Sequence, residues 1–484
     1  MQSFRFNARG CRSGFLIWMT VFFLCTNAFL PDPILGMSLS EEGKIGKELL
    51  DKIKERMALV EDGEVLTYVQ SVGSRVVKQL GNTLYPYQFF VINQSVPNAF
   101  AIPGGYVFIY RGLIEMMASE GELAGILSHE VGHIQARHFQ RRMEEGRILN
   151  IATIASVLAA ALIGVQGGSG AGVQALTMGA MAGAQTFELK YSRENEEEAD
   201  QLGLRYLVAA GYPATDMVSV MQRMHQAQWM VNSSIPSYLS THPALNERVQ
   251  YLQDLIRKPE YRVQSSSSKN LGDFAIMQAS LISEYSDPKT AQERFLAGIS
   301  KGDIAATYGL GRLYLRQGKY AEALPYLQDA ARQCSGSPFV LSTLGDAYHK
   351  LGRLNEAQRT LQTALLLDPS SLVAHYRLAL VLKESGQKEE ALQHLQRLEE
   401  WTPAFPDIDY NLGIILGQLN RMGLAHFYLG RYSLQRHDWN VAVFHFRKAK
   451  ALISDSPQKW EEIDRGMKEA EKRLKEMGPR GMNK

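Results

Sequence analysis

The sequence predicts a mainly α-helical protein in which a small α+β domain is followed by a solenoid of paired helices. Three observations support this fold class. Apolar residues recur at helical spacing over most of the chain, two short strand-like runs lie within residues 87–110, and a 34-residue period begins after residue 300. A chain of 484 residues is long enough for about three domains of ~150 residues each.

Composition excludes several classes of protein. The chain is 45% apolar and 21% charged, with 52 basic and 50 acidic side chains, so it is neither disordered nor collagenous. A net charge of +2 provides no broad basic field, and we expect no nucleic-acid partner.

The first thirty residues have the layout of a secretory signal. Arg5, Arg9 and Arg12 precede an uncharged, largely apolar run over 15–30. We expect residues 1–28 to be a signal peptide that is cleaved after Ala28 and directs export to the periplasm. The alternative is an uncleaved anchor in the inner membrane, although a span needs ~17–25 residues. Two of the three cysteines lie in this leader, so we expect no intramolecular disulfide.

The α+β domain is predicted over residues 38–262. Residues 41–80 form one or two amphipathic helices, and the strand-like runs 87–93 and 99–110 flank a turn at 103–105. From Gly112 a helical pattern leads into the sequence HEVGH at 129–133. A second helix, rich in acidic residues, is predicted to begin near Ser192 and to end at 211–213.

The HEVGH segment points to metal-dependent hydrolysis. His129 and His133 are four residues apart, so on a helix both imidazoles project from one face and can bind one zinc ion. Glu130 is placed beside them, where its carboxylate can take a proton from the attacking water. The alternative without a metal site is a surface helix that carries two histidines by chance.

A zinc site of this kind needs a third protein ligand. The pattern HExxHxxGxxH does not apply, because Ala136 and Phe139 occupy its glycine and third histidine positions. The acidic run 192–200 offers several carboxylates, and Glu196 and Asp200 are one helical turn apart. One of them can bind the metal, and the other can orient a histidine or donate a proton to the product amine.

These segments together carry a family resemblance. HEVGH, SRENEEEAD at 192–200 and NAFAIPGGYVFIYRGLI at 98–114 resemble the HtpX-like and CAAX-prenyl-protease-like zinc metallopeptidases. The resemblance implies a zincin-like (gluzincin) domain with one Zn²⁺ per chain. It implies the ligands His129, His133 and Glu196, the general base Glu130, and Asp200 as a second acidic residue of the site.

The resemblance also extends to the segment Ser240–Pro243. It implies that His242 can fill the fourth position on zinc and hold the enzyme latent. The alternative is that Thr241 caps a helix and His242 is merely exposed. His138 follows the motif at a spacing of five from His133, which predicts a surface position.

Between the two ligand helices, residues 148–187 contain no charged side chain. We expect a helical hairpin that covers the cleft or makes peripheral contact with a membrane or partner, rather than a true span. The glycine-rich segment 167–170 would allow this cover to move.

The C-terminal part has a clear internal period. After a predicted linker at 263–275, small residues recur every 34 positions, at Gly311, Gly345, Ala379 and Gly413 and again at Ala323, Ala357, Ala391 and Ala425. This period is that of tetratricopeptide repeats, predicted here over 276–475. After Gly413 the register slips by half a repeat, which predicts one helix shared by two repeats.

The sequence therefore favours an exported zinc endopeptidase in envelope protein quality control. Its repeats would engage protein substrates or assembly machinery, and the resemblance implies outer-membrane beta-barrel proteins and the complex that assembles them. The competing hypothesis is a non-proteolytic chaperone or scaffold in which His242 permanently plugs the zinc site. Processing of prenylated CAAX proteins is disfavoured, because the chain lacks the several spans of an integral enzyme.

Overall fold

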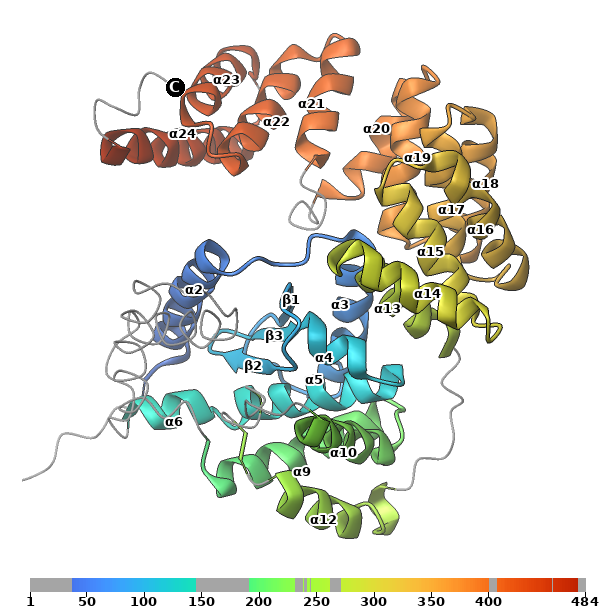
Figure 1. Cartoon of the computed structure of the whole chain (residues 1–484). Helices are drawn as coiled ribbons and strands as arrows, with labels where there is room; N and C mark the ends of the chain where they lie inside the picture. The colour runs from blue at the N-terminus through green and yellow to red at the C-terminus, as the bar shows by residue number, and fades with distance from the viewer. Residues whose placement is uncertain are drawn as a thin grey trace, which may run out of the picture.

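The computed structural model describes residues 37–144, 191–230, 238, 242–243, 245–261, 271–399, 407–454 and 456–477. Within these ranges, a three-stranded sheet and its surrounding helices form an N-terminal body, and paired helices continue from it as a curved solenoid (Figure 1). The last helices of the solenoid arch back above the N-terminal body. This architecture confirms the predicted fold class.

Several predicted features lie outside the described residues: the leader at 1–28, the uncharged run 148–187, most of the linker at 263–275, and Ser240 and Thr241. Among the helices of the described ranges, none combines the length and the apolar character needed to cross a bilayer.

The sheet is built from the two strand-like runs that the sequence indicates. Its strands are β1 (Gln88–Ile92), β2 (Ala99–Ile102) and β3 (Tyr106–Tyr110), in the order β1-β3-β2. β3 runs parallel to β1 and antiparallel to β2. Gly104 and Gly105 both have φ +86°, a conformation that glycine adopts without strain, and they form the predicted turn.

The helices of the N-terminal body surround this sheet. Residues 41–80 form two helices, each capped at its N-terminus: Ser38 forms a capping box with Glu41, and the Asp62 carboxylate accepts from two backbone amides. The pattern that begins at Gly112 is interrupted before Ser119, which caps a new helix. The helices are α2 (Leu39–Arg56), α3 (Gly63–Val77), α4 (Arg111–Met116), α5 (Glu120–Gln135), α6 (His138–Glu144), α9 (Arg193–Ala209), α10 (Ala214–Met230) and α12 (Leu245–Leu255), with a 3-10 turn at Pro259–Tyr261.

The solenoid consists of antiparallel helix pairs, as the 34-residue period predicts. Its helices are α13 (Leu271–Tyr285), α14 (Pro288–Ile299), α15 (Ile304–Arg316), α16 (Tyr320–Gln333), α17 (Pro338–Lys350), α18 (Leu354–Leu367), α19 (Leu372–Glu384), α20 (Lys388–Gln396), α21 (Ile408–Gln418), α22 (Met422–Gln435), α23 (Trp439–Leu452) and α24 (Pro457–Met477).

The predicted half-repeat slip is confirmed at α22. A Cβ on Gly413 of α21 would lie 2.7 Å from Leu429 of α22, and a Cβ on Gly430 of α22 would lie 2.6 Å from Phe446 of α23. Both glycines therefore permit close helix contact. α22 serves as the second helix of one repeat and as the first helix of the next.

Helix α13 joins the two parts of the chain. It begins at Leu271, inside the predicted linker, and its Phe274, Met277 and Leu281 belong to the hydrophobic core of the N-terminal body. The first repeat helix is therefore anchored in the body by buried apolar surface.

A buried ionic cluster adds a second contact between the body and the solenoid. Glu64, at the start of α3, is 1% exposed and accepts hydrogen bonds from Arg312 of α15 and Arg377 of α19, both at 2.6 Å. Tyr308 and Thr343 donate to the same carboxylate from 3.2 Å. Burial opposes ionisation, but the two guanidinium groups hold the pKa of Glu64 below its usual value. Side chains from three successive repeats therefore bind one end of α3.

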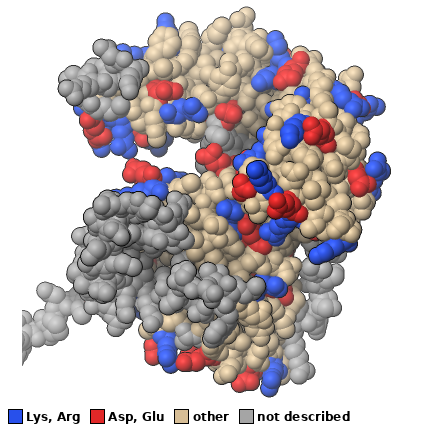
Figure 2. Space-filling view, viewed as in Figure 1, with Lys and Arg blue, Asp and Glu red and all other residues tan. Residues whose placement is uncertain are grey.

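Farther along, the solenoid leaves the body. Figure 2 shows open space between the C-terminal helices and the N-terminal body, with acidic and basic side chains along both rims.

Candidate active site

Two helices that cross at very short distance form the base of the site. A Cβ on Gly132 of α5 would lie 2.7 Å from the Ala199 carbonyl oxygen of α9, and a Cβ on Gly203 would lie 2.9 Å from the His129 amide nitrogen. Glycine at both positions lets α5 and α9 approach. α5 is buried from Glu120 to Ile134, so its histidines face the protein interior and not solvent.

The structure brings His129, His133, Glu196 and His242 together. One nitrogen or oxygen atom of each lies within 4.8 Å of those of the others, and all four side chains are buried. His129 Nε2 lies 3.0 Å from His133 Nε2, and each of these nitrogens lies 3.5 Å from a Glu196 oxygen. The two histidines and the carboxylate come from helices separated by some sixty residues.

His242 occupies the fourth corner of this cluster. Its Nδ1 lies 3.0 Å from Glu196 Oε1 and 3.4 Å from His129 Nε2. Tyr238, one turn earlier, stacks on its ring at a centroid distance of 4.4 Å. The alternative of an exposed His242 is wrong, because the residue is fully buried.

Asp200 lies behind His129 and does not face the cluster. Its Oδ1 accepts from His129 Nδ1 at 2.9 Å. Arg248 of α12 donates to both Asp200 oxygens, at 2.8 and 2.6 Å, and also pairs with Glu196. Burial alone would raise the pKa of both acids, but Arg248 keeps the pKa of Asp200 low and that of Glu196 well below its usual range. Both carboxylates are therefore ionised at neutral pH.

His138 lies in the interior, so the predicted surface position is wrong. α5 ends at Gln135, and Arg137 has φ +55°, which turns the chain and folds α6 back toward the site. His138 Nδ1 lies 2.8 Å from His133 Nδ1, and its Nε2 lies 3.1 Å from Glu198. Helical spacing does not hold across such a turn, and this accounts for the error.

These contacts determine which ring nitrogens carry protons. Nδ1 of His129 donates to Asp200. Nε2 of His138 donates to the Glu198 carboxylate, so Nδ1 of His138 accepts a hydrogen bond from His133. The proton of His133 therefore lies on Nδ1. Both Nε2 atoms then present lone pairs 3.0 Å apart. Two facing lone pairs beside a carboxylate repel one another without a cation, and imidazole with carboxylate is a donor set that suits zinc. The residues present therefore fit a divalent metal.

Glu130 has a different environment from the other two acids. Neither of its oxygens has a hydrogen-bond partner among the described residues, and Oε1 lies 3.6 Å from His242 Nε2. Burial raises the pKa of Glu130. A buried carboxylate with free lone pairs and a raised pKa is suited to accept a proton.

The sequence assigns no role to three contributors to this site. Arg248 follows His242 by six positions within the segment that carries the resemblance, and the need to neutralise buried acids is the signal that could have identified its role. Tyr191, which stacks on His133 at 4.0 Å, and Tyr238 carry no pattern in the sequence that marks them.

Family models match segments in both parts of the chain. Residues 65–256 match the model of peptidase family M48, and residues 303–370 and 348–412 match models of the tetratricopeptide repeat. The M48 match contains His129, Glu130, His133, Glu196, Asp200, His242 and Arg248.

Curated relatives cover most of the chain. It is 27% identical over 376 residues to the beta-barrel assembly-enhancing protease of Yersinia pestis, a match that spans 77% of this chain and 75% of that protein. The protein of the same name in Escherichia coli K12 is 28% identical over 75% of this chain and 74% of its own length. The mitochondrial metalloendopeptidase OMA1 of Schizosaccharomyces pombe is 28% identical over 46% of this chain and 61% of its own length.

Proposed function

We propose that this chain, a metallopeptidase that joins an M48 peptidase domain to tetratricopeptide repeats, is an exported zinc endopeptidase of envelope protein quality control. It degrades misassembled proteins and, through its repeats, assists the assembly of outer-membrane beta-barrel proteins. The observation that supports hydrolysis is the convergence of two Nε2 lone pairs and the Glu196 carboxylate beside the unpaired carboxylate of Glu130. The names of the relatives support the substrate class.

His129, His133 and Glu196 would hold the metal, and His242 would complete the set at rest. When bound, the metal supplies a Lewis acid that polarises the scissile carbonyl and acidifies water. Glu130 takes the proton of the attacking water and returns it to the leaving amine. Its raised pKa favours the first of these steps, because the carboxylate accepts a proton more readily.

Asp200 acts as a positioning residue in this proposal. Its contact with His129 Nδ1 fixes the tautomer and the ring orientation of that ligand. Because Arg248 already donates to both of its oxygens, Asp200 is poorly placed to donate a proton to product. Of the two roles that the sequence allows, the geometry supports orientation of the ligand.

The closed position of His242 supports latency. Its ring fills the place where substrate and water would approach, and every side chain of the cluster is buried. The same observation favours the second candidate function, a periplasmic scaffold in which His242 stays in the zinc site permanently. In the protease proposal, displacement of His242 by substrate or partner opens the site.

One zinc ion per chain is the first expected result. Purified mature protein should contain one equivalent of zinc, and anomalous scattering should place it between His129, His133 and Glu196. A His242→Ala variant should keep the ion, because three protein ligands remain. Absence of an anomalous peak at this position from the folded protein would refute the proposed site.

Removal of the plug is expected to increase proteolysis. A His242→Ala variant should cleave casein at least several-fold faster than wild type, since water and substrate gain the fourth position. The double variant Glu130→Gln/His242→Ala is the matched control and should be inactive. If zinc-replete wild type and His242→Ala both fail to cleave casein but still suppress aggregation, the scaffold function is correct.

A further inference from the structure

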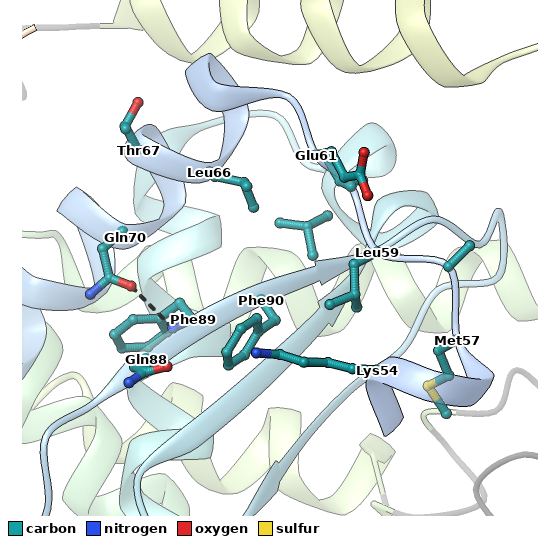
Figure 3. Close-up of a pocket in the computed structure, with 13 residues that line it drawn as sticks. Lys54, Met57, Leu59, Glu61, Leu66, Thr67, Gln70, Gln88, Phe89 and Phe90 are labelled. Atoms are coloured by element: carbon teal, nitrogen blue, oxygen red, sulfur yellow. Dashed lines mark hydrogen bonds between the residues drawn. The ribbon is translucent and has the colours of Figure 1, made fainter. Parts of the chain in front are cut away.

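A large pocket lies on the edge of the sheet formed by β1. It has a volume of about 800 Å³ and is bounded by β1, the end of α2, the first turns of α3 and the connecting segment 57–61. Figure 3 shows Leu59, Leu66 and Phe90 directed toward this space, which we call the β1 pocket. Its lining is mainly apolar, with Lys54 and Glu61 of opposite charge near its rim.

The β1 pocket is separate from the candidate active site. β1 and β2 are the opposite edges of the sheet, with β3 between them. Ala101 and Ile102 of β2 line a small space together with His133, whereas β1 contributes no residue to it. A molecule in the β1 pocket would therefore not contact the proposed zinc ligands.

The backbone of β1 has unpaired hydrogen-bonding groups at this pocket. Parallel pairing directs the amides and carbonyls of Gln88, Phe90 and Ile92 toward β3, so those of Phe89 and Val91 point outward. The Phe89 amide donates to the Gln70 side chain at 3.1 Å, and the Val91 carbonyl accepts from the Val60 amide at 2.8 Å. The Phe89 carbonyl and the Val91 amide have no partner among the described residues, and both residues line the pocket.

The Phe89 carbonyl and the Val91 amide are spaced to pair with the backbone of an extended segment. One residue of a strand parallel to β1 would donate its N–H to the Phe89 carbonyl and accept from the Val91 amide. Segment 58–60 already pairs with the end of β1, so the new pairing is limited to about one residue. Unpaired N–H and C=O groups at the edge of a sheet are a template for pairing with another extended segment.

The pocket is also continuous with the interface between the body and the repeats. Leu66 contacts the hydrophobic core of the body and also the core of the repeats around α19. Two residues earlier, Glu64 binds Arg377 of α19. The β1 pocket therefore adjoins the place where α19 of the repeats contacts α3.

We infer that the β1 pocket is an accessory site that binds an extended, apolar segment of the protein substrate by one-residue strand pairing with β1. This inference rests on the proposed proteolytic function, because it assigns the pocket to capture of the same substrate. Opposite charges at the rim and an apolar lining do not favour a small charged ligand. The site holds substrate through β1 while cleavage takes place at the other edge of the sheet.

Kinetics of an Ala58→Arg variant test the inference. Ala58 is exposed and lines the pocket, so a long charged side chain blocks the mouth without disturbing the core. In a His242→Ala background we expect KM for casein to rise at least fivefold, with kcat unchanged. Cleavage of a short internally quenched peptide, which cannot reach both sites, should be unaffected. The matched control is Ala297→Arg, at an exposed alanine of α14 in the repeats.

A binding measurement separates this inference from the proposed function. A photoreactive benzoylphenylalanine at position 58 of Glu130→Gln protein should crosslink to casein, whereas the same group at position 297 should not. Crosslinking without any cleavage in the active background would reject the protease and retain the accessory site. Equal crosslinking at both positions, or an unchanged KM for casein in Ala58→Arg, would overturn the accessory site.

Discussion

Replacement of Glu130 by glutamine is expected to abolish peptide hydrolysis and to leave the metal in place. The amide keeps the size of the side chain but cannot accept a proton from water at neutral pH. General acid–base catalysis contributes about 10²–10⁴-fold to rates, and the proposed mechanism uses Glu130 in two proton transfers. We therefore expect a loss of at least about 10³-fold in kcat for casein in the His242→Ala background.

The zinc content separates loss of catalysis from loss of structure. The Glu130 carboxylate makes no hydrogen bond within the described residues, so the variant should bind one zinc ion and unfold at the same temperature as its parent. A Glu196→Gln variant is the matched comparison, since it should lose both zinc affinity and activity. Undiminished cleavage by Glu130→Gln would exclude this residue as the base.

The parts of the molecule that obey local periodicity could be predicted from the sequence. The 34-residue spacing of small residues predicted the helix pairs and the shared helix α22, because close helix packing leaves room only for glycine or alanine there. The spacing of four between His129 and His133 placed both rings on one helical face. Glu196 could be chosen among its acidic neighbours only through family resemblance, and in the structure it lies within 3.5 Å of both histidines.

The remaining features depend on contacts that no local pattern encodes. His138 was misplaced because Arg137 breaks the helical register with a positive φ. Arg248 reaches Asp200 from a helix that begins 45 residues later in the chain. Glu64 meets Arg312 and Arg377 across 248 and 313 residues, and no local pattern marks these three residues as partners.

The buried carboxylate of Glu64 leads to the second large expected effect. A Glu64→Gln variant should weaken the contact between the body and the repeats, because Arg377 keeps only a distant carboxylate, that of Asp346 at 3.9 Å, and Arg312 keeps only Asp62. Removal of one partner from a buried ion pair costs about 3–5 kcal/mol. Differential scanning calorimetry should show one cooperative transition in wild type and two in the variant. Small-angle scattering should show a larger radius of gyration for the variant.

The same interface should become less stable as the pH falls. The pKa of Glu64 is lower in the folded protein than its usual value of 4.5, so the unfolded chain binds a proton first as the pH falls. The stabilisation by Glu64 is therefore fully present above about pH 4.5 and is lost progressively below it. Wild type should approach the two-transition behaviour of Glu64→Gln as the pH decreases below this value.

In contrast, Glu48→Gln removes only an exposed pair with Lys52 and should cost less than about 1 kcal/mol. If Glu64→Gln unfolds in one transition at the wild-type temperature, the anchor between the two domains lies in the apolar contacts of α13 and not in this cluster.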